Sequence, residues 1–190
     1  MKHIKLASAA AIAMGIVLAG SASAAASNGG TITFTGAVND TTCTVTGGSG
    51  TNGGQGNFIV ALDPAEPAQL ATAGDVANPH AFGVVIGGPG QGSCTDGMVA
   101  SMSFLLSSPQ IDAATGALKN ALAGEATNVQ VQLTDSNGAI NLADASYHQD
   151  SPAIVNNTAT IPFSAQYLAV GGAATPGLVS TSVVYAVTYN

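Results

Sequence analysis

The stretch STSVVYAVTY, residues 180–189, decides how this chain folds. Its larger side chains Val183, Tyr185, Val187 and Tyr189 occupy every second position. A period of two over this length predicts a β-strand that buries one face. We expect this strand to be the last one, because only one residue follows it.

Comparable strand signals recur along the rest of the sequence. Alternating or continuously apolar runs, bounded by Gly, Asn, Asp or Pro, predict strands over residues 31–38, 42–45, 57–62, 80–87, 98–106, 127–134 and 159–168. Between these runs we expect a glycine-rich loop over residues 47–56 and an irregular or short helical segment over residues 64–78.

A hairpin is predicted where Asp135-Ser136-Asn137-Gly138 separates two alternating runs, because Asn-Gly is a strong turn signal. Ile140 and Leu142 then belong to the return strand. About seven or eight short strands with turns between them predict an all-β sandwich of the Ig-like type.

The two outermost strands raise a question of pairing. Residues 31–38 alternate cleanly, with Ile32, Phe34, Gly36 and Val38 on one face. The final strand would present an open edge unless another strand covers it, and open edges promote aggregation. Residues 31–38 of the same molecule or of another molecule would cover that edge equally well, and periodicity does not distinguish the two.

The beginning of the chain has the features of a secretory signal. Lys2 and Lys5 precede an apolar stretch, and Ala22-Ser23-Ala24 has the small-residue pattern of a cleavage site. We therefore expect residues 1–24 to be removed, with cleavage after Ala26 as the alternative. No later stretch approaches the length of a membrane-spanning helix.

The charge balance excludes several partners. Removal of the signal leaves Lys119 as the one basic residue against ten acidic ones, and the sequence contains no Arg. Nucleic acid and anionic membranes attract basic surfaces, so neither is an expected partner. Catalysis is not expected either, since His80 and His148 lie in unrelated segments and no nucleophile motif is present. We expect no cofactor and no metal.

Cys43 and Cys94 are the only cysteines. In an exported chain an isolated pair is typical of one disulfide, because the compartment is oxidising. Such a bond would close a long loop and contribute about 4 kcal/mol through the lost entropy of the unfolded chain. Two free buried thiols are the alternative.

Several stretches, taken in order, carry a family resemblance. Residues 28–38 are predicted to form an alternating strand with Gly36 between larger apolar positions, and Cys43 and Cys94 follow. Residues 128–138 contain the hairpin, residues 161–167 form the next strand, and Gly177 and the penultimate Tyr189 mark the C-terminal end. In this order and spacing the chain resembles the chaperone–usher pilin family, and in particular the major subunits of type 1 fimbriae.

The resemblance implies an incomplete Ig-like β-sandwich, residues 39–190, that is completed by a donor strand from a neighbouring subunit. Residues 25–38 would be the N-terminal extension that provides this strand. In such a family a periplasmic chaperone fills the groove first, and at an outer-membrane usher the next subunit's extension replaces it. The implied donor residues are Ile32, Phe34, Gly36 and Val38. The implied residues of the acceptor groove and chaperone contact are Gly177, Val183, Tyr185, Val187 and Tyr189.

The sequence therefore predicts a structural subunit of a surface fimbria that supports adhesion. The expected partners are neighbouring copies of the subunit, the chaperone and the usher, and the expected route is export through the periplasm. A minor, adaptor or tip-associated subunit with a binding role is the alternative. A two-domain tip adhesin is not expected, because the mature chain has no room for an additional lectin domain.

Overall fold

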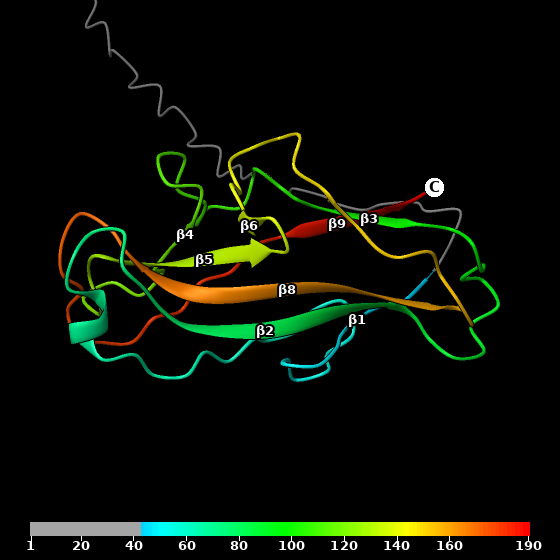
Figure 1. Ribbon diagram of the computed structural model, residues 1–190, viewed down its shortest axis with the longest axis horizontal. Coiled ribbons are helices and arrows are strands. Elements are labelled where there is room, and N and C mark those ends of the chain that lie inside the picture. The colour runs from blue at the N-terminus through cyan, green and yellow to red at the C-terminus, as the bar shows by residue number, and fades with distance from the viewer. Residues whose placement is uncertain (1–42) are drawn as a thin grey trace, which may run out of the picture. The chain divides into compact units, whose positions relative to one another are not determined.

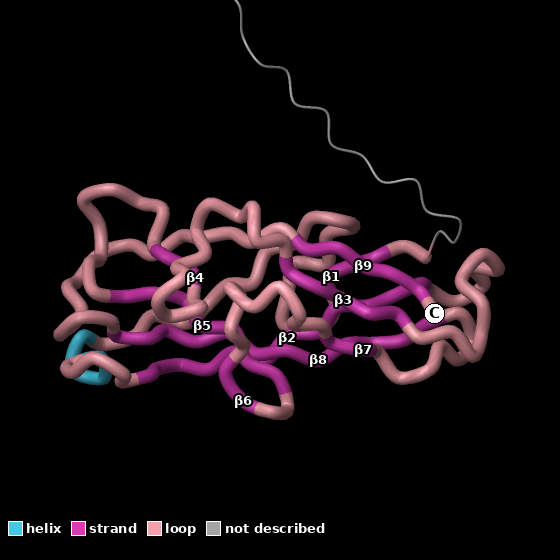
Figure 2. Tube along the Cα trace, turned by 90° about the horizontal axis from the view of Figure 1, so that it is seen from above, coloured by secondary structure: helices cyan, strands magenta, loops and turns pink. Residues whose placement is uncertain are grey.

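In a computed structural model, residues 43–190 form two antiparallel β-sheets that pack face to face (Figure 1). The larger sheet has the strand order β1-β2-β8-β5-β4, with β6 paired to β5, and the smaller sheet has the order β7-β3-β9. Figure 2 shows β9, β3 and β7 side by side in one layer. The larger sheet contains β1 (Val45–Gly47), β2 (Val76–Gly87), β4 (Leu118–Lys119), β5 (Val129–Asp135), β6 (Gly138–Ala139) and β8 (Thr158–Ala169). The smaller sheet contains β3 (Ala100–Phe104), β7 (Gln149–Asp150) and β9 (Tyr185–Tyr189), and a single 3₁₀ turn, η1, spans Pro67–Leu70.

The long strands β2 and β8 are the centre of the larger sheet. Their register places Val84 opposite Ile161 and Phe82 opposite Phe163. Val84 and Ile161 are completely buried. Alternate residues of each strand therefore point into the sandwich, which is the arrangement that the period of two predicts.

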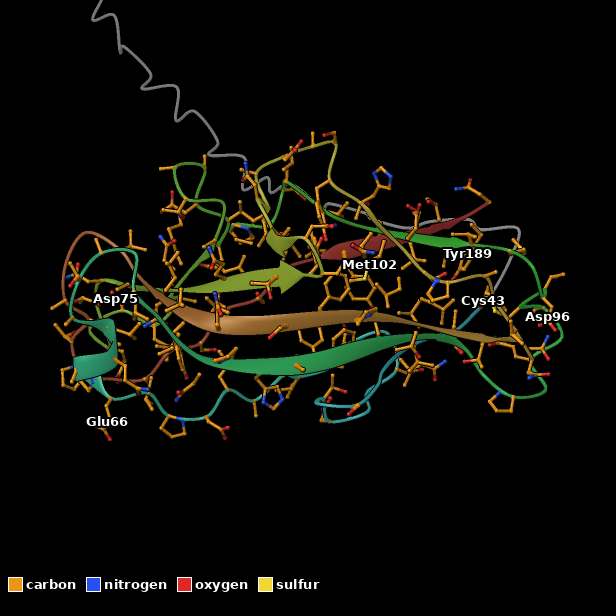
Figure 3. The ribbon with its side chains drawn as sticks, viewed as in Figure 1. Cys43, Glu66, Asp75, Asp96, Met102 and Tyr189 are labelled. Atoms are coloured by element: carbon orange, nitrogen blue, oxygen red, sulfur yellow. A yellow bond between two sulfur atoms is a disulfide. The ribbon has the colours of Figure 1, made fainter. Side chains whose placement is uncertain are left out.

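Aromatic side chains join the two sheets. Phe163 on β8 stacks with Phe82 at a centroid distance of 5.6 Å and meets Phe104 of β3 edge-on at 5.9 Å. Tyr147 stacks on the other side of Phe104 at 6.0 Å. Met102, labelled in Figure 3, adds a buried side chain between the sheets. The core thus lies between β2 and β8 on one side and β3 on the other.

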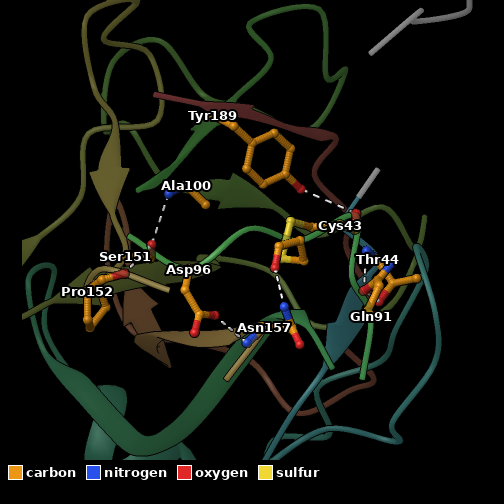
Figure 4. Close-up of a disulfide and its surroundings, with 10 residues drawn as sticks. Cys43, Thr44, Gln91, Asp96, Ala100, Ser151, Pro152, Asn157 and Tyr189 are labelled. Atoms are coloured by element: carbon orange, nitrogen blue, oxygen red, sulfur yellow. Dashed lines mark hydrogen bonds between the residues drawn. A yellow bond between two sulfur atoms is a disulfide. The ribbon is translucent and has the colours of Figure 1, made fainter. Parts of the chain in front are cut away.

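Cys43 and Cys94 form a disulfide, as the sequence predicts. The bond is buried, and Asn157 donates a hydrogen bond from its side chain to the Cys94 carbonyl at 2.7 Å (Figure 4). Gly87 packs directly against it, since a Cβ atom there would lie 2.6 Å from the Cys94 sulfur. The phenol of Tyr189 donates to the Cys43 carbonyl at 3.3 Å, so the last strand is tied to the disulfide as well.

The strands predicted over residues 80–87, 98–106, 127–134 and 159–168 are confirmed, with ends that differ by a few residues. The strands predicted over residues 42–45 and 180–189 are confirmed only in part, because ladder pairing begins at Val45 in the first and at Tyr185 in the second. The prediction of a strand over residues 57–62 is wrong, because this segment belongs to neither sheet ladder. The return strand of the hairpin is shorter than predicted, although Ile140 and Leu142 are buried as expected. The irregular or short helical segment expected over residues 64–78 contains the 3₁₀ turn η1, but its last residues, from Val76 on, belong to β2.

The predicted signal over residues 1–24 and the predicted donor strand over residues 31–38 lie outside the described residues. Within residues 43–190, no helix has the length and apolar character needed to cross a membrane.

Loss of the disulfide should destabilise the subunit. Replacing Cys43 and Cys94 together by Ser leaves no free thiol, and we expect it to lower the free energy of unfolding by about 2–5 kcal/mol. Denaturant unfolding of the purified subunit measures the change, and the periplasmic yield should fall with it. Wild-type protein treated with a reductant is the matched control and should unfold at the same denaturant concentration as the double variant. An unchanged unfolding midpoint in both would contradict a structural role for the bond.

Candidate binding groove

An open groove of about 680 Å³ lies where the two sheets fail to close. Its floor is the core itself, because buried side chains from both sheets line it. These floor residues are Phe82, Met102, Phe104, Leu118, Val131, Leu133 and Ala165. Among residues 43–190, no strand covers this open side of the core.

Two extended segments form the walls of the groove. One wall is residues 56–62, in which Phe58, Val60 and Leu62 are half-buried while the residues between them are exposed. The other wall is residues 179–185, which runs into β9. There the half-buried positions are Val179, Thr181, Val183 and Tyr185. Both walls therefore turn every second side chain inward, as strands do, although neither forms a ladder across the groove.

In the described part of the chain, the second wall and its continuation to Asn190 have backbone hydrogen bonds on one side only. Val99 and Asn190 exchange both backbone hydrogen bonds at 3.0 Å, and Leu105 donates to Val184 at 2.8 Å. Along a strand, the backbone N–H and C=O groups of successive residues point to opposite sides. The backbone groups of the even-numbered residues therefore bond toward β3, and those of the odd-numbered residues point away from it. Within residues 43–190, the backbone groups of Val183 and Tyr185 have no hydrogen bond toward the groove.

The opposite wall has the same property. The amides of Val60, Ala61 and Leu62 make no hydrogen bond to any other part of the chain that the structure describes. Two rows of unpaired backbone groups thus flank one apolar trough. A single extended strand laid in the trough could bond to either row while its side chains entered the core.

Polar side chains hold the second wall in place from outside the groove. Ser108, which is buried, accepts a hydrogen bond from the Val184 amide at 3.0 Å and donates to the Leu105 carbonyl at 2.7 Å. Asn120 donates to the Leu178 carbonyl at 2.9 Å and accepts from the Ser180 amide at 3.0 Å. The wall is therefore fixed on its outer side and remains unpaired on its inner side.

Two tyrosines attach β9 to the N-terminal part of the domain. The Tyr185 hydroxyl donates to the Gly56 carbonyl, and its ring lies 5.9 Å from that of Phe58, so the two walls meet at this end of the groove. Burial raises the pKa of Tyr185, and burial together with the proximity of Tyr185 raises the pKa of Tyr189. Both phenols consequently remain protonated, and remain donors, throughout the physiological pH range.

The structure places the residues suggested for the groove in different positions. Val183 and Tyr185 line it. Val187 and Tyr189 lie further along the same strand, beyond the lining, where they pair with Met102 and Ala100. Gly177 does not line the groove. It packs against the backbone at Ala126, where a Cβ atom would lie 2.3 Å from the amide nitrogen, and its φ of 151° suits glycine.

Sequence reasoning missed one wall and the residues that hold the other. Residues 57–62 were expected to form an ordinary strand, and only the folded structure shows that they line an opening. Ser108 and Asn120 lie in loops 76 and 60 residues from Val184 and Ser180, the wall residues whose amides they bind, so no local pattern identifies this role. Within the described part of the chain, no group of acidic, His or Cys side chains is suited to hold a metal.

Over the described residues 43–190, an all-β sandwich exposes an apolar groove beside an unpaired edge, which is the kind of surface to which strand addition occurs. A profile of the fimbrial protein family matches residues 32–190. The chain therefore belongs to this family. It is a fimbrial subunit of the chaperone–usher type, which makes it an exported structural protein and not an enzyme.

Individual relatives agree with this assignment. The chain is 38% identical over 182 residues to a major fimbrial subunit of Stenotrophomonas maltophilia, with 92% of this chain and all of the relative covered. It is 32% identical to the A chain of the type 1 fimbrial protein of Escherichia coli, with 88% and 87% covered. The crystal structure of PapA, the rod subunit of the P pilus, superimposes with a TM-score of 0.52 at 16% identity, over 71% of this chain and 94% of PapA. A subunit from a chaperone–usher pilus structure gives the same TM-score at 16% identity, over 86% and 97%.

Removal of the Ser108 hydroxyl should loosen the groove wall. In Ser108→Ala the part-buried hydrogen bond from the Val184 amide is lost, which should lower the free energy of unfolding by about 0.5–1.5 kcal/mol. Amide hydrogen exchange at Val184 and its neighbours should accelerate. Ser146→Ala is the matched control, because Ser146 donates to Asp144 on an exposed loop, and it should change stability by less than about 0.5 kcal/mol. Equal effects of the two substitutions would show that Ser108 does not hold the wall.

Proposed function

We propose that this chain is a major fimbrial subunit that polymerises by donor-strand exchange. The N-terminal strand of one copy, residues 31–38, occupies the groove of the next copy. The observation that carries this proposal is the groove itself, in which core side chains and a row of unpaired backbone groups are exposed together. Such a surface is incomplete until another strand covers it.

The predicted donor strand suits the groove in length and pattern. Ile32, Phe34, Gly36 and Val38 span seven residues with a period of two, and the wall over residues 179–185 also spans seven. Apolar side chains that face one way enter an apolar trough, and the threonines between them remain on the outer side. Each large side chain buried in this way contributes about 1.5–3 kcal/mol.

The remaining partners follow from the same surface. A subunit with an open core would aggregate during export, so a periplasmic chaperone that covers the groove is required until assembly. An outer-membrane usher would then be the place where the next subunit's donor strand displaces the chaperone. The predicted signal over residues 1–24 fits this route.

A major subunit is favoured over a tip-associated one by the presence of both halves of the contact. A subunit inside a fibre must accept one strand and donate another; this chain has a groove, and its sequence predicts a matching strand over residues 31–38. Its resemblance to a major fimbrial subunit supports the same conclusion.

Deletion of residues 27–38 should abolish fibres and leave a subunit that still binds a periplasmic chaperone. The variant keeps the whole groove and loses only the donor strand, so electron microscopy of the cell surface should show no polymer, while chaperone co-purification continues. Fibres of normal length from the deletion variant would contradict the proposal.

A pair of point variants tests which face of the donor strand enters the groove. Phe34→Asp places a charge in the apolar trough and should reduce polymer by more than tenfold, since burying an unpaired charge is strongly unfavourable. Thr33→Asp introduces the same charge on the opposite face of the strand and should polymerise nearly as well as the wild type. SDS-resistant ladders from unheated cells measure both. Equal loss in the two variants would argue that the strand does not insert with this face inward.

A further inference from the structure

Thr181 is unusual among the side chains of the groove. The buried and half-buried side chains of the lining are aliphatic or aromatic, apart from that of Thr181 in the second wall. Its hydroxyl oxygen is sealed from water and has no hydrogen-bond partner, and among residues 43–190 no other buried side-chain oxygen or nitrogen lacks one.

An unpartnered buried hydroxyl destabilises the protein that contains it. The cost of leaving such a group without a partner is about 1–3 kcal/mol, and valine would fill the same volume without that cost. Buried polar groups in native proteins almost always have a partner, so an exception calls for an explanation. In a groove that awaits a strand, the missing partner is expected to arrive with the strand.

The donor strand contains one position that could supply this partner. At Ile32, Phe34 and Val38 a large side chain would separate the hydroxyl from the donor backbone, whereas Gly36 has no side chain. Its main chain would therefore lie open to the wall. Water does not reach the Thr181 hydroxyl oxygen although the groove is open, and rotation about the Cα–Cβ bond, which exchanges the hydroxyl with the methyl group between staggered positions, would turn it toward a strand in the groove.

The register that sets Gly36 opposite Thr181 also sets the other inward-facing donor residues opposite half-buried residues of the wall. Every strand pair in the described part of the chain is antiparallel, and an antiparallel donor strand in this register sets Phe34 opposite Val183 and Ile32 opposite Tyr185. Val38 then lies opposite Val179. The inward-facing positions of the donor strand thus cover the half-buried positions of the wall from end to end.

We propose that Thr181 is the register- and specificity-determining residue of the groove, and that its hydroxyl hydrogen-bonds to the main chain of the neighbouring subunit at Gly36. The inference rests on the proposed donor-strand exchange and adds a polar recognition point to it. A donor strand with a bulky residue at this position, or one shifted by two residues, would leave the hydroxyl buried and unpaired.

The test compares fibres of the full-length exported protein carrying Thr181→Val, Thr181→Ser, Gly36→Ala or the Val and Ala substitutions together. The rate at which subunits dissociate from purified fibres in guanidinium measures the contact. Fibres of Thr181→Val should dissociate about five- to thirtyfold faster than the wild type, because one buried hydrogen bond is lost, whereas Thr181→Ser should remain close to the wild type. The double variant should dissociate no faster than Gly36→Ala alone, because both changes remove the same hydrogen bond.

A second measurement separates the contact from the stability of the subunit. Thermal unfolding of monomers recovered from the fibres should show Thr181→Val to be at least as stable as the wild type. Valine fibres that dissociate at the wild-type rate or more slowly, or rates that multiply in the double variant, would overturn the role of Thr181 and leave donor-strand exchange intact. Wild-type chains that form no fibre through residues 31–38 would overturn both proposals.

Discussion

The unpaired inner edge of the last strand is the constraint on which the rest of this structure depends. Backbone amide and carbonyl groups need hydrogen-bond partners when water is excluded from them. Residues 184–190 meet this need on the side of β3, where Val99 and Asn190 exchange two bonds, and the odd-numbered residues Val183 and Tyr185 remain open on the other side. An edge of this kind beside an exposed core is a surface that a strand completes.

The remainder of the domain keeps that edge open and in place. Ser108 and Asn120 bond to the wall from its outer side, and an inward movement of the wall would break these hydrogen bonds. The disulfide and the Tyr189 phenol hold the end of β9 near Cys43. Because these contacts lie outside the groove, the domain has a defined acceptor surface before any strand arrives. Preorganisation of this kind lowers the entropy that binding must overcome.

Strand addition also explains why so simple a sequence can build a fibre. Main-chain hydrogen bonds make few demands on side chains, and the few inward positions of the strand provide the selection. An apolar floor accepts many apolar side chains of similar size, and in the contact that we propose the hydroxyl of Thr181 would distinguish one register from the next. In this proposal the apolar floor of the groove provides affinity for the strand, and the Thr181 hydroxyl provides the contact that fixes its register.

The sequence by itself determined the fold class, the disulfide and most of the strands, because these depend on local periodicity and on the presence of only two cysteines. The alternation in residues 159–168 and the Asn137-Gly138 turn are examples, since each is a signal within about ten residues. Only the tertiary structure decided that residues 57–62 form a wall instead of a strand, that Gly177 packs against Ala126 outside the groove, and that Thr181 lacks a partner. These features depend on contacts between segments far apart in the chain, and a pattern along the sequence shows which face of a strand is apolar without showing what covers it.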